Sequence, residues 1–198
     1  ARGLGRQLAL QAAAQGAHIV AWDLDDPGLD DLAGELGSSL ASRAVVDVTD
    51  RASVDAGVEA LPNGADDVDI VVNNAGLGGT ANLVDMTDEQ WSAVLDVTLN
   101  GTFRCTRAAL RQMTGQGHGV IVNNASVLGW RAQAGQAHYA AAKAGVMALT
   151  RCAAIEAADS GVRVNAVAPS IAMHPFLAKV TSDELLEELA GREAFGRP

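Results

Sequence analysis

Short apolar runs alternate with longer segments of helical periodicity along the whole chain. The runs are rich in β-branched residues and end at polar or turn residues, which is typical of strands. They cover residues 17–22, 43–48, 69–72, 119–125 and 163–167. The intervening segments repeat apolar positions every three or four residues, as amphipathic helices do. They cover residues 6–16, 29–36, 51–61, 88–113, 138–158 and 182–190. This alternation predicts an α/β fold with a parallel sheet covered by helices on both faces.

One helix start is marked strongly. Thr87 precedes two acidic residues, and Gln90 stands three positions later. This spacing predicts a capping box, in which the two side chains satisfy the first backbone N–H groups of the helix. The chain of 198 residues has no internal repeat and no linker-like stretch, so it predicts a single domain over residues 1–198.

Composition narrows the functional classes. The formal net charge of −10 argues against partners such as nucleic acid or an anionic membrane surface. No apolar run approaches the length of about 20 residues that a membrane-spanning helix needs. Cys105 and Cys152 fall inside predicted helices without metal-ligand spacing, so we expect buried thiols in a reducing compartment, the cytoplasm.

The strongest chemical signal lies between Ser126 and Lys143. Tyr139 and Lys143 are four residues apart, so they share one face of the predicted helix. A nearby ammonium favours the phenolate form of a tyrosine, which otherwise titrates near about 10. Ser126 follows an apolar run, at the strand end where open α/β sheets bind ligands. The three groups together suit proton transfer at a substrate oxygen.

The alternative is a helical Tyr–Lys pair without chemistry. Scarcity favours the functional interpretation, because the chain contains one tyrosine and only two lysines, Lys143 and Lys179.

With these residues in view, the chain resembles the classical short-chain dehydrogenases/reductases over essentially its whole length. Six features stand in that family's order, and the ordered set is specific although each alone is weak. They are Gly3-x-Gly5, Asp47-Val48, Asn73-Asn74-Ala75-Gly76, Ser126, Tyr139-x-x-x-Lys143 and Asn165-Ala166-Val167-Ala168-Pro169. The resemblance implies a Rossmann-type doubly wound parallel sheet in three αβα layers and a nicotinamide-dependent oxidoreductase.

The resemblance also implies roles for the matched residues. Tyr139 corresponds to the general acid/base, Ser126 to the group that binds the substrate oxygen, and Lys143 to the group that lowers the tyrosine pKa and holds the nicotinamide ribose. The family's further catalytic Asn falls at Thr98, while an Asn stands at position 100. On a helix those two positions point about 200° apart, so we do not expect Asn100 to replace it.

Cofactor contacts are implied in the same way. The phosphate loop corresponds to Gly3, Leu4 and Gly5, where glycine admits the pyrophosphate to a helix N-terminus. Further matched positions are Asp47 and Val48 for the adenine pocket, Asn74, Ala75 and Gly76 for the adenosine side, and Pro169 to Ile171 for the carboxamide. Two more departures are Ser170 for the usual Gly and His174 for the usual Thr.

The residues predict NAD as the cofactor, with NADP as the alternative. Asp23 ends the strand after the glycine loop, where a carboxylate binds ribose hydroxyls and repels a 2′-phosphate. Arg2 favours NADP. For the substrate, the family resemblance leaves open steroid-like rings, 3-hydroxyacyl thioesters and other secondary alcohols or ketones. The alternative functions are an NADPH-dependent 3-oxoacyl-thioester reductase and a catalytically silent nucleotide-binding scaffold.

Two expectations concern the whole protein. The long helices over 88–113 and 138–158 carry many small residues, and the family pairs such helices, so we expect a homodimer or homotetramer. The family places a strand before the glycine loop and a strand near the C-terminus, in the sheet order 3-2-1-4-5-6. We therefore expect residues 1–198 to be a fragment that folds and binds NADH poorly by itself.

Overall fold

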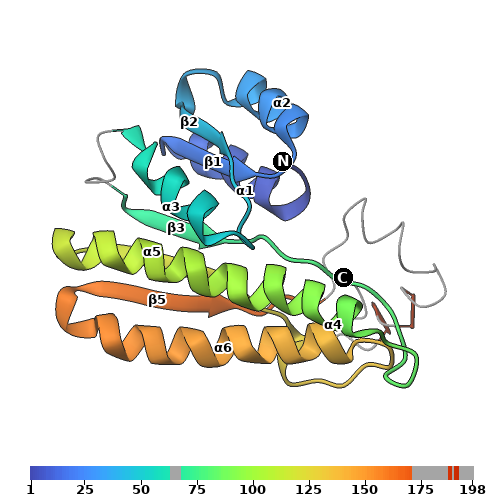
Figure 1. The fold of residues 1–198 in the computed structure, drawn as a ribbon. Coiled ribbons are helices and arrows are strands. Elements are labelled where there is room, and N and C mark those ends of the chain that lie inside the picture. Colours follow the sequence, from blue (N-terminus) through green and yellow to red (C-terminus); the bar gives the residue numbers. More distant parts are fainter. Residues whose placement is uncertain (63–67, 171–186, 189, 192–198) are drawn as a thin grey trace.

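The computed structural model describes residues 1–62, 68–170, 187–188 and 190–191. Helices and strands alternate through this part of the chain (Figure 1). The strands are β1 (Ile19–Asp23), β2 (Leu40–Val45), β3 (Ile70–Asn73), β4 (Gly119–Asn124) and β5 (Val162–Val167). The helices are α1 (Gly3–Ala14), α2 (Asp26–Leu36), α3 (Arg51–Glu59), α4 (Asp88–Leu95), α5 (Gly101–Gln116) and α6 (Ala137–Ala157).

All strand pairs are parallel, as the alternating pattern predicts. The strands form two sheets, β1-β2 and β3-β4-β5, with no described strand between β1 and β3. These sheets match positions 3-2 and 4-5-6 of the expected order. The fold is therefore the predicted Rossmann-type α/β arrangement.

Two apolar clusters hold the helices against these sheets. Leu29, Leu32 and Leu36 of α2 pack with Ala21 of β1. A second cluster joins α5 and α6 to β4 and β5 through Met113, Ile121, Ala153, Ala157, Val162 and Val164. Burying such side chains stabilises the fold by about 1.5–3 kcal/mol each.

The predicted start of the long helix is confirmed, since Thr87 and Gln90 form the reciprocal capping box. The helical run continues to Gln116, beyond the predicted end at 113, but its hydrogen-bond register changes on the way. A π-helical turn over Asp96–Asn100 separates α4 from α5. π-Helical turns of this kind are frequent at functional sites.

The structure corrects two sequence-based expectations. The second strand was predicted over 43–48, but β2 spans Leu40–Val45. It does not extend to residue 48 because the Asp47 N–H donates to the Ser53 hydroxyl at 2.9 Å instead of to a neighbouring strand. Cys152 was expected to be buried and is exposed on α6, whereas Cys105 is half-buried. Most of the helix predicted over 182–190 lies outside the described residues. No helix in the described part of the chain is long and apolar enough to cross a membrane.

Candidate active site

Three of the predicted catalytic residues, Ser126, Tyr139 and Lys143, lie between the end of β4 and the first turns of α6. Ser126 follows β4 by two residues and is 7% exposed. Its hydroxyl accepts a hydrogen bond from the Leu128 backbone N–H at 3.2 Å and so caps a short 3-10 turn. This bond fixes the serine side chain at the carboxyl edge of the sheet.

Lys143 is almost completely buried, at 3% exposure. Its ammonium donates to the Asn124 carbonyl at 2.5 Å, so the last residue of β4 orients it. The Nζ atom lies 5.5 Å from the centroid of the Tyr139 ring. Helix α6 therefore presents the phenol and the ammonium on one face, as their spacing predicts.

The pKa values differ from the sequence-based expectation. Burial raises the pKa of the Tyr139 phenol, and hydrogen bonding with Ser126 opposes this only in part. The ammonium was expected to lower that pKa, whereas the shift of Tyr139 is upward and is caused mainly by burial. Burial also lowers the pKa of Lys143 to about 8.

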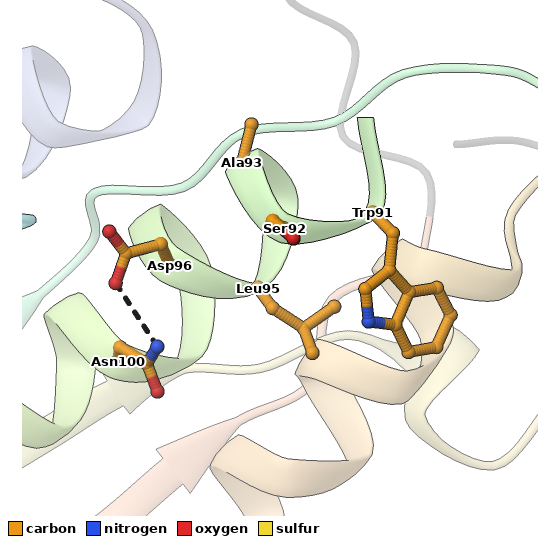
Figure 2. A pocket seen from close by; sticks show the side chains of 6 residues that line it. All are labelled: Trp91, Ser92, Ala93, Leu95, Asp96 and Asn100. Carbon is orange, nitrogen blue, oxygen red and sulfur yellow. Dashed lines mark hydrogen bonds between the residues drawn. The ribbon is translucent and has the colours of Figure 1, made fainter. Parts of the chain in front are cut away.

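Thr98 lies in the π-helical turn and is fully buried, at 0% exposure. Its hydroxyl accepts from the Leu77 N–H at 3.0 Å and donates to the Leu77 carbonyl at 3.1 Å. Asn100 is exposed and donates to Asp96 at 3.0 Å instead (Figure 2). The expectation that Asn100 cannot replace residue 98 is confirmed. Thr98 clamps the loop that follows β3.

A second clamp joins this loop to the residues before Tyr139. The Ala81 N–H donates to the Gly135 carbonyl at 3.1 Å, and Gln136 donates to the Gly79 carbonyl at 2.9 Å. His138 is 2% exposed, and its Nδ1 accepts from the Tyr139 N–H at 2.9 Å. The clamping role of Gln136 has no signal in the spacing of residues.

The glycine loop meets the loop after β3. Gly3 has φ of +60°, and α1 begins there. A Cβ at Gly5 would lie 2.9 Å from Asn74 Nδ2, so the first turn of α1 lies close to the Asn74 side chain. Asn74 in turn accepts from Asn124 Nδ2 at 3.0 Å. The start of α1 and the ends of β3 and β4 thus converge. Leu4 is 37% exposed in this first turn.

The remaining residues of this loop also face the catalytic groups. A Cβ added at Gly76 would lie 3.7 Å from the Thr98 hydroxyl and 3.8 Å from Lys143 Nζ. Ala75, beside it, is exposed. The close approach of Gly76 links the predicted adenosine-side loop to the catalytic lysine.

The carboxyl ends of β1 and β2 carry the two predicted aspartates. Asp23 ends β1, and its carboxylate accepts from the Asp25 N–H at 3.0 Å. Asp47 accepts from the Thr49 N–H at 2.8 Å, and Val48 is half-buried. A cavity of about 720 Å³ opens beside them between the starts of α1 and α2, lined by Arg2, Gly3, Leu4, Arg6, Asp25 and Gly28 among others.

The last predicted segment is described only in part. The Pro169 carbonyl accepts from the Val127 N–H at 3.0 Å, which ties the chain after β5 to the turn that Ser126 caps. Ile171 and His174 lie outside the described residues.

Comparisons with known proteins agree with this geometry. The family model described as short chain dehydrogenase matches residues 1–185. A relative from Mycobacterium tuberculosis is 56% identical over 199 residues, which cover 98% of this chain and 76% of the relative. That relative is (5R,7aS)-5-hydroxy-7a-methyl-1-oxo-2,3,5,6,7,7a-hexahydro-1H-indene-carboxyl-CoA reductase.

Other matches are more distant or structural. The 3-oxoacyl-[acyl-carrier-protein] reductase of Thermotoga maritima is 38% identical over 200 residues, covering 100% of this chain and 80% of that protein. The crystal structure of a short chain dehydrogenase from Mycobacterium smegmatis superposes with a TM-score of 0.82 at 52% identity, covering 87% of this chain and 74% of that one. The chain thus belongs to the short chain dehydrogenase family and is an NAD(P)-dependent oxidoreductase acting on CH–OH or keto groups.

Proposed function

We propose that this protein interconverts a secondary alcohol and a ketone, with Tyr139 as the general acid/base. The observation that carries the proposal is the buried Lys143 ammonium, held by the Asn124 carbonyl at 2.5 Å on the same helix face as Tyr139. Burying a cation costs free energy. Buried titratable groups of this kind are found preferentially at functional sites. Ser126 stands beside the phenol and completes the set.

In the reductive direction the residues act on the carbonyl oxygen. A nicotinamide, when bound, would supply the hydride for the carbonyl carbon. The Tyr139 hydroxyl gives its proton to the oxygen. The Ser126 hydroxyl donates a hydrogen bond to that oxygen as negative charge develops on it. The protonated Lys143 stabilises the phenolate that remains. Oxidation reverses each transfer.

The described residues fit a dinucleotide. The first turn of α1 presents unpaired N–H groups, and at Gly5 it lies close to the Asn74 side chain. We assign Gly3, Leu4 and Gly5 to the pyrophosphate, Asp47 and Val48 to the adenine, and Lys143 and Tyr139 to the nicotinamide ribose. We assign Asn74, Ala75 and Gly76 to the adenosine side and Pro169 to the carboxamide, and the resemblance assigns Ile171, outside the described residues, to the carboxamide as well.

We infer that NAD is preferred over NADP. The Asp23 carboxylate lies at the carboxyl end of β1. There it would accept hydrogen bonds from the ribose hydroxyls of NAD and repel the 2′-phosphate of NADP. Arg2 is exposed and makes no cap bond to α1. A fixed carboxylate therefore outweighs an arginine that is free to turn toward solvent.

For the substrate we propose a ring ketone or alcohol carried on a CoA thioester. The M. tuberculosis relative at 56% identity is named for a bicyclic substrate of this kind. The turn after Ser126 adds an apolar surface, because Trp130 is 67% exposed there. The second candidate, an NADPH-dependent 3-oxoacyl-thioester reductase, is favoured by Arg2 and by the T. maritima relative at 38% identity.

A substrate and cofactor panel separates these functions. Bicyclic ketones, as CoA thioesters and as free acids, and a linear 3-oxoacyl-CoA are each tested with NADH and NADPH. We expect the highest kcat/KM with NADH and a ring ketone on CoA. Higher kcat/KM with NADPH and the linear thioester would establish the second candidate.

The catalytic assignment is tested with Tyr139→Phe. The ring remains and only the proton-carrying oxygen is lost, so we expect kcat to fall by about 10² to 10⁴ while the NADH Kd stays unchanged. A variant that retains most of its kcat would refute the role of Tyr139.

We further propose a homo-oligomer, a dimer or tetramer, formed through α5 and α6 in the cytoplasm. Apolar side chains stand exposed on both helices, with Phe103 at 41% and Ile155 at 79%.

A further inference from the structure

Arg104 connects two parts of the molecule that lie far apart in the sequence. It projects from the first turn of α5, and its side chain is 20% exposed. One guanidinium nitrogen donates to the Val48 carbonyl at 3.1 Å. The other donates to the Asp96 carboxylate at 3.0 Å. A single planar group thus joins the loop after β2 to the π-helical turn.

The loop after β2 has little freedom at this point. A Cβ at Gly101 would lie 2.7 Å from Val48 Cγ2, so α5 packs directly against the Val48 side chain. On the other side, the Asp47 N–H donates to the Ser53 hydroxyl of α3 at 2.9 Å. Helices α3 and α5 therefore hold Asp47 and Val48 from both sides, and Arg104 supplies the polar contact from α5.

Asp96 determines where the guanidinium points. The same carboxylate oxygen accepts from Arg104 and from Asn100, each at 3.0 Å. Figure 2 shows Asp96 and Asn100 in the wall of a surface hollow with Trp91 and Leu95. Because two donors share one acceptor oxygen, the carboxylate is fixed in place, and it fixes the fork of Arg104 in turn.

We infer that Arg104 is a positioning residue for the adenine end of the cofactor site. It holds the backbone of Val48, and with it the adenine-facing wall formed by Asp47 and Val48. This inference rests on the proposed function, which assigns that wall to the adenine. Within the described part of the chain, no contact found joins Arg104 to Ser126, Tyr139 or Lys143, so we expect its loss to act mainly on binding of the adenine end.

Arginine suits this task better than lysine. Its rigid fork donates in two directions at once, whereas one ammonium on a flexible stem does not reproduce both bonds in the same geometry. Arg104→Lys should therefore restore only part of what Arg104→Met loses. A purely electrostatic role would be restored fully by lysine.

The test separates the two ends of the cofactor. Arg104→Met, Arg104→Lys and Asp96→Asn are compared with wild type and with the control Arg107→Met. Arg107 lies on the same helix and stacks on Phe103, 4.8 Å from the ring centroid. Titration calorimetry gives Kd for NADH and ADP-ribose. Steady-state kinetics give kcat with NADH and kcat/KM with reduced nicotinamide mononucleotide, which lacks adenosine.

We expect Arg104→Met to weaken NADH and ADP-ribose binding roughly tenfold, as loss of one charge-assisted hydrogen bond does. The kcat at saturating NADH and the kcat/KM with the mononucleotide should change less than twofold. Asp96→Asn should weaken binding in the same direction but less, and Arg107→Met should match wild type.

Two results would overturn the inference. One is unchanged NADH affinity in Arg104→Met. The other is an equal fall in kcat/KM with NADH and with the mononucleotide, which would indicate a general structural role. If Arg104→Met does not fold, Arg104→Lys and Asp96→Asn give the same comparison. Failure of the proposed function has a different signature, because wild type itself would then bind neither NADH nor ADP-ribose.

Discussion

Lys143 is both charged and buried, and burial destabilises a charge. It carries a positive charge at neutral pH, and only 3% of its surface is exposed to solvent. Its one described hydrogen bond goes to the Asn124 carbonyl. Burial lowers its pKa from 10.5 to about 8. The folded state therefore holds the proton on this lysine less tightly than the unfolded chain does.

This pKa shift predicts how stability depends on pH. Between about pH 8 and 10.5 the unfolded state binds more protons at Lys143 than the folded state, so stability rises with pH in that window. The burial penalty that is present below about pH 8 is on the order of 3 kcal/mol. Replacing Lys143 by an apolar residue would remove this penalty. The same replacement would lose the hydrogen bond to Asn124, which costs about 1 kcal/mol of stability.

Lys143→Met should therefore raise Tm at pH 7 while abolishing turnover. The Tm difference from wild type should shrink as pH rises from 8 to 10, and calorimetry across this range measures it. Arg151→Met serves as a control, because it removes an exposed cation from the same helix. A difference that stays constant with pH would show that the buried charge does not destabilise the fold.

For single residues, the sequence predicted which side chains lie together in the site better than it predicted their pKa values. Helical spacing alone placed Tyr139 and Lys143 on one face, because a four-residue interval fixes relative direction. The direction of the Tyr139 pKa was predicted wrongly. It depends on how much water the fold removes, and residue spacing does not give that quantity.

Among the elements, the π-helical turn does most to shape the site. It turns Thr98 inward to clamp Leu77 and leaves Asn100 outside. The sequence predicted one uninterrupted helix over 88–113, since the apolar pattern continues through the turn. A π-helical turn changes the hydrogen-bond register by one residue without a proline or glycine signal.

Thr98→Val tests the clamp. Valine keeps the shape but removes both part-buried hydrogen bonds between the Thr98 hydroxyl and the Leu77 backbone. We expect a loss of about 1–3 kcal/mol in stability, measured by urea unfolding, together with a lower kcat/KM.

Thr98→Ser should remain close to wild type because it keeps the hydroxyl. Thr114→Val is the matched control, since that exposed hydroxyl bonds only the Leu110 carbonyl of its own helix. Equal effects at positions 98 and 114 would contradict the clamp.

The connection between α6 and β5 depends on a glycine that the sequence does not single out. Gly161 has φ of +71°, and a Cβ there would lie 2.5 Å from the Gly117 carbonyl oxygen. Gly161→Ala combines left-handed strain of about 1–2 kcal/mol with a backbone clash, so we expect a loss above about 2 kcal/mol.

Gly115→Ala is the contrasting change for the same measurement by thermal unfolding. It lies within α5, and a Cβ there meets nothing within 4 Å. Alanine should stabilise this position by about 0.5–1 kcal/mol. Similar losses at both positions would indicate that the close approach of Gly117 does not matter.

For the whole molecule, the alternation of strands and helices was sufficient to predict a parallel α/β fold. Periodicity reports which faces are buried, and burial on both faces of a sheet is specific to this class. It does not report buried polar networks. Asn73, Asn123, Thr106 and Thr150 form one beneath the site, with an Asn73–Asn123 bond of 2.8 Å. Such a network is visible only once the strands and helices are placed together.

The outer face of α5 and α6 belongs to the proposed subunit contact. Ala148, Cys152 and Ile155 are exposed at positions that share one face of α6. Ile155 exposes 79% of its surface, and Phe103 on α5 exposes 41%. Exposed large apolar side chains on both helices are what the proposed contact would cover.

We therefore expect a homo-oligomer in light scattering at micromolar concentration, and Ile155→Asp should reduce its mass. A carboxylate buried at a two-fold contact meets its symmetry mate or remains unpaired, and both are unfavourable. Val84→Asp is the control, because Val84 is 92% exposed in the loop before α4 and distant in sequence from both helices. A wild-type monomer, or equal dissociation by both substitutions, would place the subunit contact elsewhere.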